Sequence, residues 1–185
     1  MRIERFQVTP ALLQSKMKPD TFRRCTMKIY FANGLFSQAD YQFNQQLTAK
    51  IREMFPEVTV YLPQENAAIN DKNAYADSQM IAQADTAELL SADLMLAVLD
   101  GVTIDSGVAS EIGVAYANHL PIIGLYTDSR QQGATHEKKL AALQEIAENQ
   151  FHYLNLYTTG LIKLNGTIVN NTEDLLEAIA NYIQA

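Results

Sequence analysis

The stretch LMLAVLDGVTIDSGVASEIGVAYA, residues 94–117, decides the fold class. Its first six residues are continuously apolar, as expected for a central parallel strand covered on both faces. Residues 100–105 form a polar loop, and small and apolar residues from position 106 onward predict a helix. A strand that leads through a short loop into a helix is the repeating unit of an α/β fold.

The same alternation extends to both sides of this stretch. The strands expected outside it span residues 28–32, 58–62 and 121–126. The helices expected outside it span about 38–55, 74–90, 136–147 and 172–183, and a weak strand or hairpin signal covers 151–168. Strands and helices at this spacing predict βαβ units. We therefore expect a three-layer α/β fold, with a mostly parallel, flavodoxin- or Rossmann-like sheet flanked by helices.

Apolar residues at helical spacing predict which helix faces are buried. In the helix near 74–90, the residues expected to point inward are Met80, Ile81, Ala84 and Leu89. The last helix, which Thr172 is expected to cap, carries an apolar stripe formed by Leu175, Leu176, Ile179 and Ile183. We expect this stripe to favour a homo-oligomer.

Composition excludes several classes of protein. A formal net charge of −7 argues against a nucleic-acid binder, which normally carries a basic patch. No apolar run approaches the roughly 18 residues that span a membrane. One cysteine, Cys25, fits a reducing cytoplasm, and three scattered histidines offer no ligand spacing for zinc. We expect a cytoplasmic protein without a metal site.

The first 26 residues differ from the rest of the chain. They hold six Lys and Arg residues against Glu4 and Asp20, and Met27 falls directly before the first expected strand. One interpretation is an upstream extension or a mis-called start, and the other is a short helix or a loose basic arm. We expect an accessory or disordered segment over 1–26, and one α/β domain over 27–185.

In folds of this class, ligands bind beyond the carboxyl ends of the strands, near a switch in strand order. This rule selects the loops 33–37, 63–73 and 100–107. The third loop leads into the helix that contains Glu111, the only acidic residue between Ser106 and Thr127. A carboxylate among apolar groups is costly unless it is paired. The spacing leaves two interpretations open: Glu111 is functional, or it lies unused at an exposed edge of the helix.

Other residues near these loops are also ambiguous. Gly107 allows a ligand or backbone to approach the helix closely, and Asp105 is expected to be the N-cap. Helical periodicity favours Asp85 as a surface residue. Asp93 lies at the strand start, on the wrong edge for a site. Tyr30 is expected in the core, with a hydroxyl that could reach a carboxylate.

Familiar nucleotide and hydrolase motifs are missing from the sequence. Gly101, Gly107 and Gly113 do not form a dinucleotide-binding turn, and no GxxxxGK[ST] loop is present. Ser106 and Ser110 lack the surroundings of a nucleophile elbow. A set of carboxylates around a mostly neutral pocket suits glycosyl chemistry, in which one carboxylate attacks the anomeric carbon while others manage protons.

Several motifs in the chain resemble the nucleoside 2-deoxyribosyltransferase family. The similarity from residue 27 to the C-terminus is carried by IYFANGLF (29–36), Asp85, Asp105-Ser106-Gly107, Glu111, Gly113 and Ala115. Order and spacing fit over about 90 residues. A weaker similarity at Asn155-Leu156-Tyr157 matches a family segment that reaches into the pocket of a neighbouring subunit.

The resemblance implies a mechanism that needs no metal or cofactor. Glu111 would attack C1′ of a 2′-deoxynucleoside, and a second base would then displace the enzyme from the covalent deoxyribosyl–glutamyl ester. Asp85 and Asp105 would hold the base and manage its proton, and Tyr30 would orient Glu111. Substrates would be 2′-deoxynucleosides and free nucleobases, in nucleotide salvage or deoxyribonucleoside catabolism.

The resemblance also implies which residues bind the substrate. Asn33, Gly34 and Phe36 would line the pocket and Gly107 would open its wall. In a homo-oligomer, Asn155 would bind the sugar hydroxyl across the interface, with Tyr157 in the same segment.

Two departures from the family leave alternatives open. Many relatives carry Gly-Pro where this chain has Asn33-Gly34. The first loop contains no basic residue, which favours an unphosphorylated nucleoside. The alternatives are hydrolysis of a 2′-deoxynucleoside or its 5′-monophosphate, and a non-enzymatic small-molecule sensor. The sequence does not distinguish purine from pyrimidine substrates.

Overall fold

A computed structural model describes residues 27–67, 75–131, 135–148 and 151–184. The prediction for residues 1–26 lies outside the described residues. The core is a five-stranded sheet in the order β2-β1-β3-β4-β5, in which every neighbouring pair is parallel. The strands are β1 (Met27–Ala32), β2 (Val58–Tyr61), β3 (Leu94–Val98), β4 (Ile122–Leu125) and β5 (Gly166–Val169). This flavodoxin-type order confirms the predicted α/β class.

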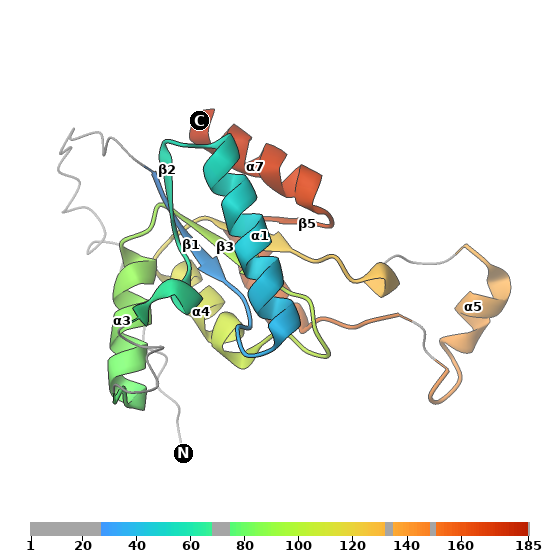
Figure 1. Cartoon of the computed structure of the whole chain (residues 1–185). Helices are drawn as coiled ribbons and strands as arrows, with labels where there is room; N and C mark the ends of the chain where they lie inside the picture. The colour runs from blue at the N-terminus through green and yellow to red at the C-terminus, as the bar shows by residue number, and fades with distance from the viewer. Residues whose placement is uncertain (1–26, 68–74, 132–134, 149–150, 185) are drawn as a thin grey trace, which may run out of the picture.

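Helices cover both faces of the sheet and complete the three layers (Figure 1). The helices are α1 (Gln38–Met54), α3 (Ser78–Leu90), α4 (Ser106–Ala117), α5 (Glu137–Ala142), α6 (Leu156–Leu164) and α7 (Thr172–Gln184). Helices α1 and α7 pack on one face, and α3, α4 and α6 pack on the other. Helix α5 projects away from the sheet and buries none of its residues (Figure 1).

Alternation along the strands divides the core into these two layers. In β1, Ile29 and Phe31 face α1 and α7, whereas Tyr30 and Ala32 face the opposite layer. All five residues of β3 are buried, as its continuous apolar sequence predicts for a central strand.

In the part of the chain that the structure describes, every helix is too short or too polar to span a lipid bilayer.

Helix α3 differs from the prediction in its start and in its buried face. It begins at Ser78, where the side chain of Asp77 accepts a hydrogen bond from the backbone N–H of Met80. Met80 and Ile81 are 50% and 38% exposed, so their predicted inward orientation is wrong. The reason is that α3 lies at the margin of the sheet and packs mainly against α4, so that Leu89 is its only buried residue.

Of the strand or hairpin predicted over 151–168, the strand is confirmed at the end of the range, where β5 begins, and the hairpin is wrong. Residues 156–164 form helix α6, which connects β4 to the parallel edge strand β5. A parallel strand requires such a crossover, whereas a hairpin joins antiparallel strands. Asn155 caps this helix by accepting hydrogen bonds from the backbone N–H groups of Tyr157 and Thr158.

The tail helix α7 packs its apolar stripe inside the chain. Leu175, Leu176 and Ile179 are buried against the sheet, because α7 packs on the apolar face of β4 and β5. The stripe therefore offers no support for the predicted oligomer. Its N-cap is Asn171 and not Thr172, since Asn171 Oδ1 accepts from the backbone N–H of Asp174 at 2.8 Å.

Candidate active site

A pocket of about 140 Å³ lies beyond the carboxyl ends of β1 and β3. Its lining consists of Ala32, Asn33, Gly34, Leu35, Phe36, Pro63, Asp85, Asp105, Gly107, Val108 and Glu111. Strand β1 lies between β2 and β3 in the sheet, so the chain reverses its direction of winding here. The pocket therefore occupies the switch point where this class of fold binds ligands.

Glu111 is held in this pocket by a buried tyrosine beneath it. The Tyr30 hydroxyl donates a 2.6 Å hydrogen bond to Glu111 Oε1, and Tyr30 itself is completely buried. Burial raises the pKa of Glu111 to about 7; the Tyr30 hydrogen bond opposes this shift and the charges of Asp85 and Asp105 add to it. At neutral pH the carboxyl is thus poised between its two protonation states.

Tyr30 remains a hydrogen-bond donor at every physiological pH. Burial, followed by the charge of Glu111 and the hydrogen bond to it, raises the pKa of the Tyr30 phenol well above its usual value. A phenol that keeps its proton can donate continuously to a carboxylate. Glu111 therefore has a permanent partner that fixes one of its two oxygens.

Asp105 and Gly107 form the start of helix α4 at the pocket wall. Asp105 Oδ1 accepts hydrogen bonds from the backbone N–H groups of Gly107 at 2.8 Å and Val108 at 3.1 Å. Asp105 is therefore the predicted N-cap. A Cβ at position 107 would lie 3.0 Å from Asp105 Oδ1, so glycine lets the cap and the pocket wall come together.

Asp85 reaches the pocket from helix α3. Its carboxyl is partly buried, and the Tyr61 hydroxyl donates to Asp85 Oδ1 at 3.4 Å. Burial raises the pKa of Asp85; the Tyr61 hydrogen bond opposes this shift and the charge of Glu88 adds to it. Asp85 is half-buried and lines the same pocket as Glu111, so the interpretation of Asp85 as a surface residue is wrong.

The first loop is supported from below by buried amides. Asn33 Nδ2 donates to Asn44 Oδ1 at 2.7 Å, and Asn44 Nδ2 donates to the Gly34 carbonyl at 3.0 Å and to Gln64 Oε1 at 2.9 Å. Asn44 is 1% exposed. This network was not predicted from the sequence. The pattern that could have indicated it is the position of Asn44, which lies three and seven residues before the buried Leu47 and Ile51 and therefore on the buried face of α1.

The structure brings eight of the ten predicted site residues together. Asn33, Gly34, Phe36, Asp85, Asp105, Gly107 and Glu111 line the pocket, and Tyr30 supports Glu111 from beneath. Asn155 and Tyr157 lie elsewhere, at the start of α6. Asn155 Oδ1 caps that helix, and Tyr157 is 76% exposed.

The electrostatics of the pocket are acidic. Three carboxyl groups line it, and no Lys, Arg or His is among its described lining residues. The part of the chain that the structure describes also contains no group of three or more His, Cys, Asp or Glu residues arranged to hold a metal ion. Carboxyl groups in such an arrangement can act as a nucleophile or carry protons, and the described lining residues include no cation for a phosphate group.

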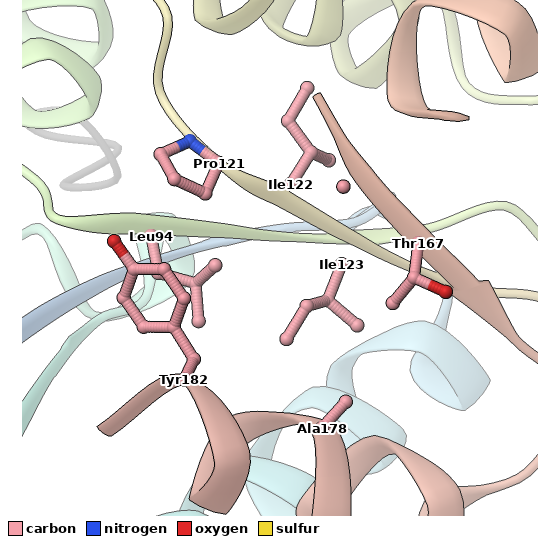
Figure 2. A pocket seen from close by; sticks show the side chains of 8 residues that line it. Leu94, Pro121, Ile122, Ile123, Thr167, Ala178 and Tyr182 are labelled. Carbon is pink, nitrogen blue, oxygen red and sulfur yellow. The ribbon is translucent and has the colours of Figure 1, made fainter. Parts of the chain in front are cut away.

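A second cavity lies at the opposite, amino edge of the sheet, between the strands and α7 (Figure 2). Its volume is about 240 Å³, and its lining consists of Leu94, Pro121, Ile122, Ile123, Gly166, Thr167, Ala178 and Tyr182. This lining is almost entirely apolar and contains no carboxyl group. It offers no chemistry for a reaction, whereas the carboxyl-edge pocket around Glu111 combines three carboxyl groups with the Tyr30 hydroxyl and is therefore the candidate active site.

Comparison with known proteins identifies the family to which the chain belongs. The family model for nucleoside 2-deoxyribosyltransferase matches residues 29–154, a span that includes the whole pocket. The chain belongs to the nucleoside 2-deoxyribosyltransferase family, whose members are enzymes that process nucleosides. A search of curated proteins finds no match.

Three of the solved structures that resemble the chain illustrate its relationships. A conserved protein of Enterococcus faecalis V583 is 65% identical, with 85% of this chain and 99% of that chain covered and a TM-score of 0.81. A 2-deoxyribosyltransferase from Bacillus psychrosaccharolyticus is 17% identical, with 80% and 90% covered and a TM-score of 0.55. A 2-desoxiribosyltransferase from Leishmania mexicana is 18% identical, with 85% and 97% covered and a TM-score of 0.57. The latter two share the fold.

Proposed function

We propose that the chain transfers 2-deoxyribose between nucleobases through a covalent deoxyribosyl–glutamyl intermediate on Glu111. The observation that carries this proposal is the Tyr30–Glu111 pair at the pocket, with its 2.6 Å hydrogen bond. A partly buried carboxylate with one oxygen fixed is suited to direct its other oxygen at a sugar carbon. Membership of the family supports the same chemistry.

The reaction takes two displacements at C1′. In the first, a Glu111 carboxylate oxygen bonds to C1′ while the C1′–N bond breaks and its electron pair leaves with the base. In the second, a nitrogen of the incoming base bonds to C1′ while the ester bond breaks and restores the Glu111 carboxylate. Each step inverts the carbon, so the overall configuration is retained, as in retaining glycosidases.

Asp85 and Asp105 are proposed to hold the base edge and to exchange its proton. A base that receives a proton as it departs leaves as a neutral molecule, which lowers the barrier. Burial raises the pKa of Asp85, so its carboxyl holds a proton to higher pH than an exposed aspartate. Asp105 combines this role with its function as the α4 cap.

The substrate is proposed to be an unphosphorylated 2′-deoxynucleoside. Three carboxyl groups and no basic side chain line the described pocket, so a 5′-phosphate would meet repulsion without a paired cation. Asn33, Gly34 and Phe36 are proposed to contact the substrate. Phe36 is 90% exposed and offers a ring for a base or sugar to pack against.

A neighbouring subunit is proposed to complete the site. The pocket of one chain, about 140 Å³, is smaller than the roughly 300 Å³ at which ordinary ligand pockets begin. The exposed segment at the start of α6 is available to a second copy. In this proposal Asn155 binds a sugar hydroxyl across the interface and Tyr157 packs nearby. If sedimentation shows a monomer, the proposed role of Asn155 across a subunit interface is wrong.

The test is a base-exchange assay. The protein is incubated with deoxyinosine or thymidine plus adenine, and deoxyadenosine is followed by chromatography. We expect deoxyadenosine from the wild type and none from Glu111→Gln. If free base appears at the same rate with and without adenine, the chain is a hydrolase. If a panel of bases shows neither exchange nor release, the proposed function is wrong.

A further inference from the structure

Two tyrosines on adjacent strands each donate a hydrogen bond to a different one of the three carboxyl groups of the pocket. Tyr30 of β1 and Tyr61 of β2 are register partners, and their rings stack with centroids 5.4 Å apart and planes 24° apart. The Tyr30 hydroxyl donates to Glu111 at 2.6 Å, and the Tyr61 hydroxyl donates to Asp85 at 3.4 Å. The stack therefore couples the positions of Glu111 and Asp85 through the sheet.

Tyr61 is itself oriented by groups outside the pocket. Asn66 Nδ2 donates to the Tyr61 oxygen at 3.1 Å, which leaves the phenol proton for Asp85. The Lys28 ammonium lies 5.7 Å from the centroid of the Tyr61 ring, on the strand next to it. Lys28 is bound in turn to Glu88 and Ser91. These contacts hold the ring while its hydroxyl faces Asp85.

We propose that Tyr61 is a positioning residue that keeps the Asp85 carboxyl directed into the pocket and controls when it carries a proton. A phenol can donate to an ionised carboxylate and can accept from a protonated one. Tyr61 can therefore remain bonded to Asp85 in both protonation states. The residue deepens the proposed function, because Asp85 is the group assigned to the proton of the base.

The other ionisable groups near Asp85 define the expected direction of its titration. Glu88 lies on the same helix, with Glu111 across the pocket and Tyr30 beneath it, and each adds negative charge or none. The cation of this cluster is the Lys28 ammonium, which is bound to Glu88. Tyr61 is the hydrogen-bond donor that stabilises the ionised form of Asp85. Loss of its hydroxyl should therefore raise the pKa of Asp85 and leave the Tyr30–Glu111 bond in place.

The decisive experiment is an NMR titration of the Asp85 carboxyl carbon in the full chain, assigned with Asp85→Asn. In Tyr61→Phe, which keeps the ring stack, we expect the pKa of Asp85 to rise, because the hydrogen bond that stabilises its ionised form is lost. Tyr182→Phe is the matched control, because its hydroxyl donates to the Asp93 carbonyl at 2.9 Å on the amino edge. An unchanged titration in Tyr61→Phe, or an equal shift in Tyr182→Phe, would overturn the proposal.

A fluorinated tyrosine at position 61 should shift the pKa of Asp85 in the opposite direction. Burial raises the pKa of Tyr61, so the more acidic fluorinated phenol stays protonated near neutral pH and donates more strongly. We expect the pKa of Asp85 to fall in this variant, and a rise or no change would count against the proposal. Both NMR measurements need no turnover, so they stand whether or not the chain transfers deoxyribose.

A kinetic comparison tests the consequence for the reaction and rests on the proposed function. With deoxyinosine as donor, Tyr61→Phe should lower kcat by about tenfold, because proton transfer to the base is impaired. With a 4-nitrophenyl 2-deoxyriboside, whose leaving group needs no proton, the same variant should keep the wild-type rate. Equal losses with both donors would show that Tyr61 has only a structural role.

Discussion

The two edges of the sheet differ sharply in chemistry although the same strands form both. At the carboxyl edge, three carboxyl groups and the Asn33 amide line a pocket at the strand switch point. At the amino edge, the cavity beside α7 is lined by apolar residues, Thr167 and the Tyr182 ring (Figure 2). The pocket where the loops of the parallel strands converge is therefore acidic, whereas the amino-edge cavity is apolar, and the charged groups of the amino edge, such as Lys28 and Glu88, are bonded to each other.

The edges are also held together in different ways. The carboxyl edge relies on side-chain hydrogen bonds, such as the Asn44 network and Asp100, which accepts from the backbone N–H groups of Thr127 and Asp128. At the amino edge, α7 packs on the strands through apolar contacts, and the Tyr182 hydroxyl adds a hydrogen bond to the Asp93 carbonyl. Changes at the carboxyl edge should therefore affect activity strongly, and changes at the amino edge should affect stability alone.

The largest expected effect follows from removal of the nucleophile. Glu111→Gln keeps the shape of the side chain but cannot form the ester, so base exchange should fall by at least about 10³-fold. Glu177→Gln makes the same change on the exposed face of α7 and should leave the rate unchanged. Steady-state rates of deoxyadenosine formation measure both. Substantial exchange by Glu111→Gln would contradict the assigned role.

The same substitution should stabilise the fold at alkaline pH. Burial raises the pKa of Glu111 to about 7, so the fold favours the protonated form and loses stability as pH rises from the unfolded value near 4.5 through 7. At pH 8 the penalty is on the order of 3 kcal/mol, from about 1.4 kcal/mol per pKa unit. Glu111→Gln should regain much of this lost unfolding free energy at pH 8 and little at pH 4.5.

Urea unfolding at the two pH values measures this difference. Glu177→Gln serves again as the control, and it should show no pH-dependent gain. Equal stability of wild type and Glu111→Gln at pH 8 would mean that the carboxyl is not strained by burial.

A smaller effect is expected from the amide network under the first loop. Asn44→Leu leaves the buried amides of Asn33 and Gln64 without their partner, which should cost about 2 kcal/mol of unfolding free energy. Asn33 would also lose its fixed position, so KM should rise more than kcat falls. The matched control is Asn181→Leu, an exposed position on α7. If folded Asn44→Leu keeps the wild-type KM, the amide network takes no part in substrate binding.

The smallest effect is expected at the amino edge. Tyr182→Phe removes the hydrogen bond to the Asp93 carbonyl and should destabilise the fold by about 1 kcal/mol. Because this edge takes no part in the proposed reaction, kcat/KM should stay at the wild-type value. A loss of activity beyond the loss of folded protein would break the contrast between the two edges.

The sequence predicted those parts of the molecule that depend on local patterns. The apolar run at 94–98 identified β3 as a central strand, and the lone acidic position in the apolar segment after Asp105 drew attention to Glu111. Both signals are visible within one element. The Asp105 cap is also local, because it needs only residues 105–108.

The features that the sequence did not predict depend on which elements become neighbours. Tyr61 approaches Asp85 only because β2 lies beside β1 and α3 lies at the sheet margin. The apolar pattern of α3 favoured Met80 and Ile81 as inward residues and so misplaced Asp85. The amides of Asn44 and Gln64 are 20 residues apart and meet only in the folded chain.

The central claim is that Glu111 forms a covalent bond to the sugar. Its most direct test is mass spectrometry of the protein after incubation with a 2′-fluoro-2′-deoxynucleoside, whose fluorine slows breakdown of the ester. We expect the mass of the wild type to increase by one fluorodeoxyribosyl group, which peptide mapping locates on Glu111. The increase should be absent from Glu111→Gln. Base release by the wild type without any adduct, or an adduct on another residue, would contradict it.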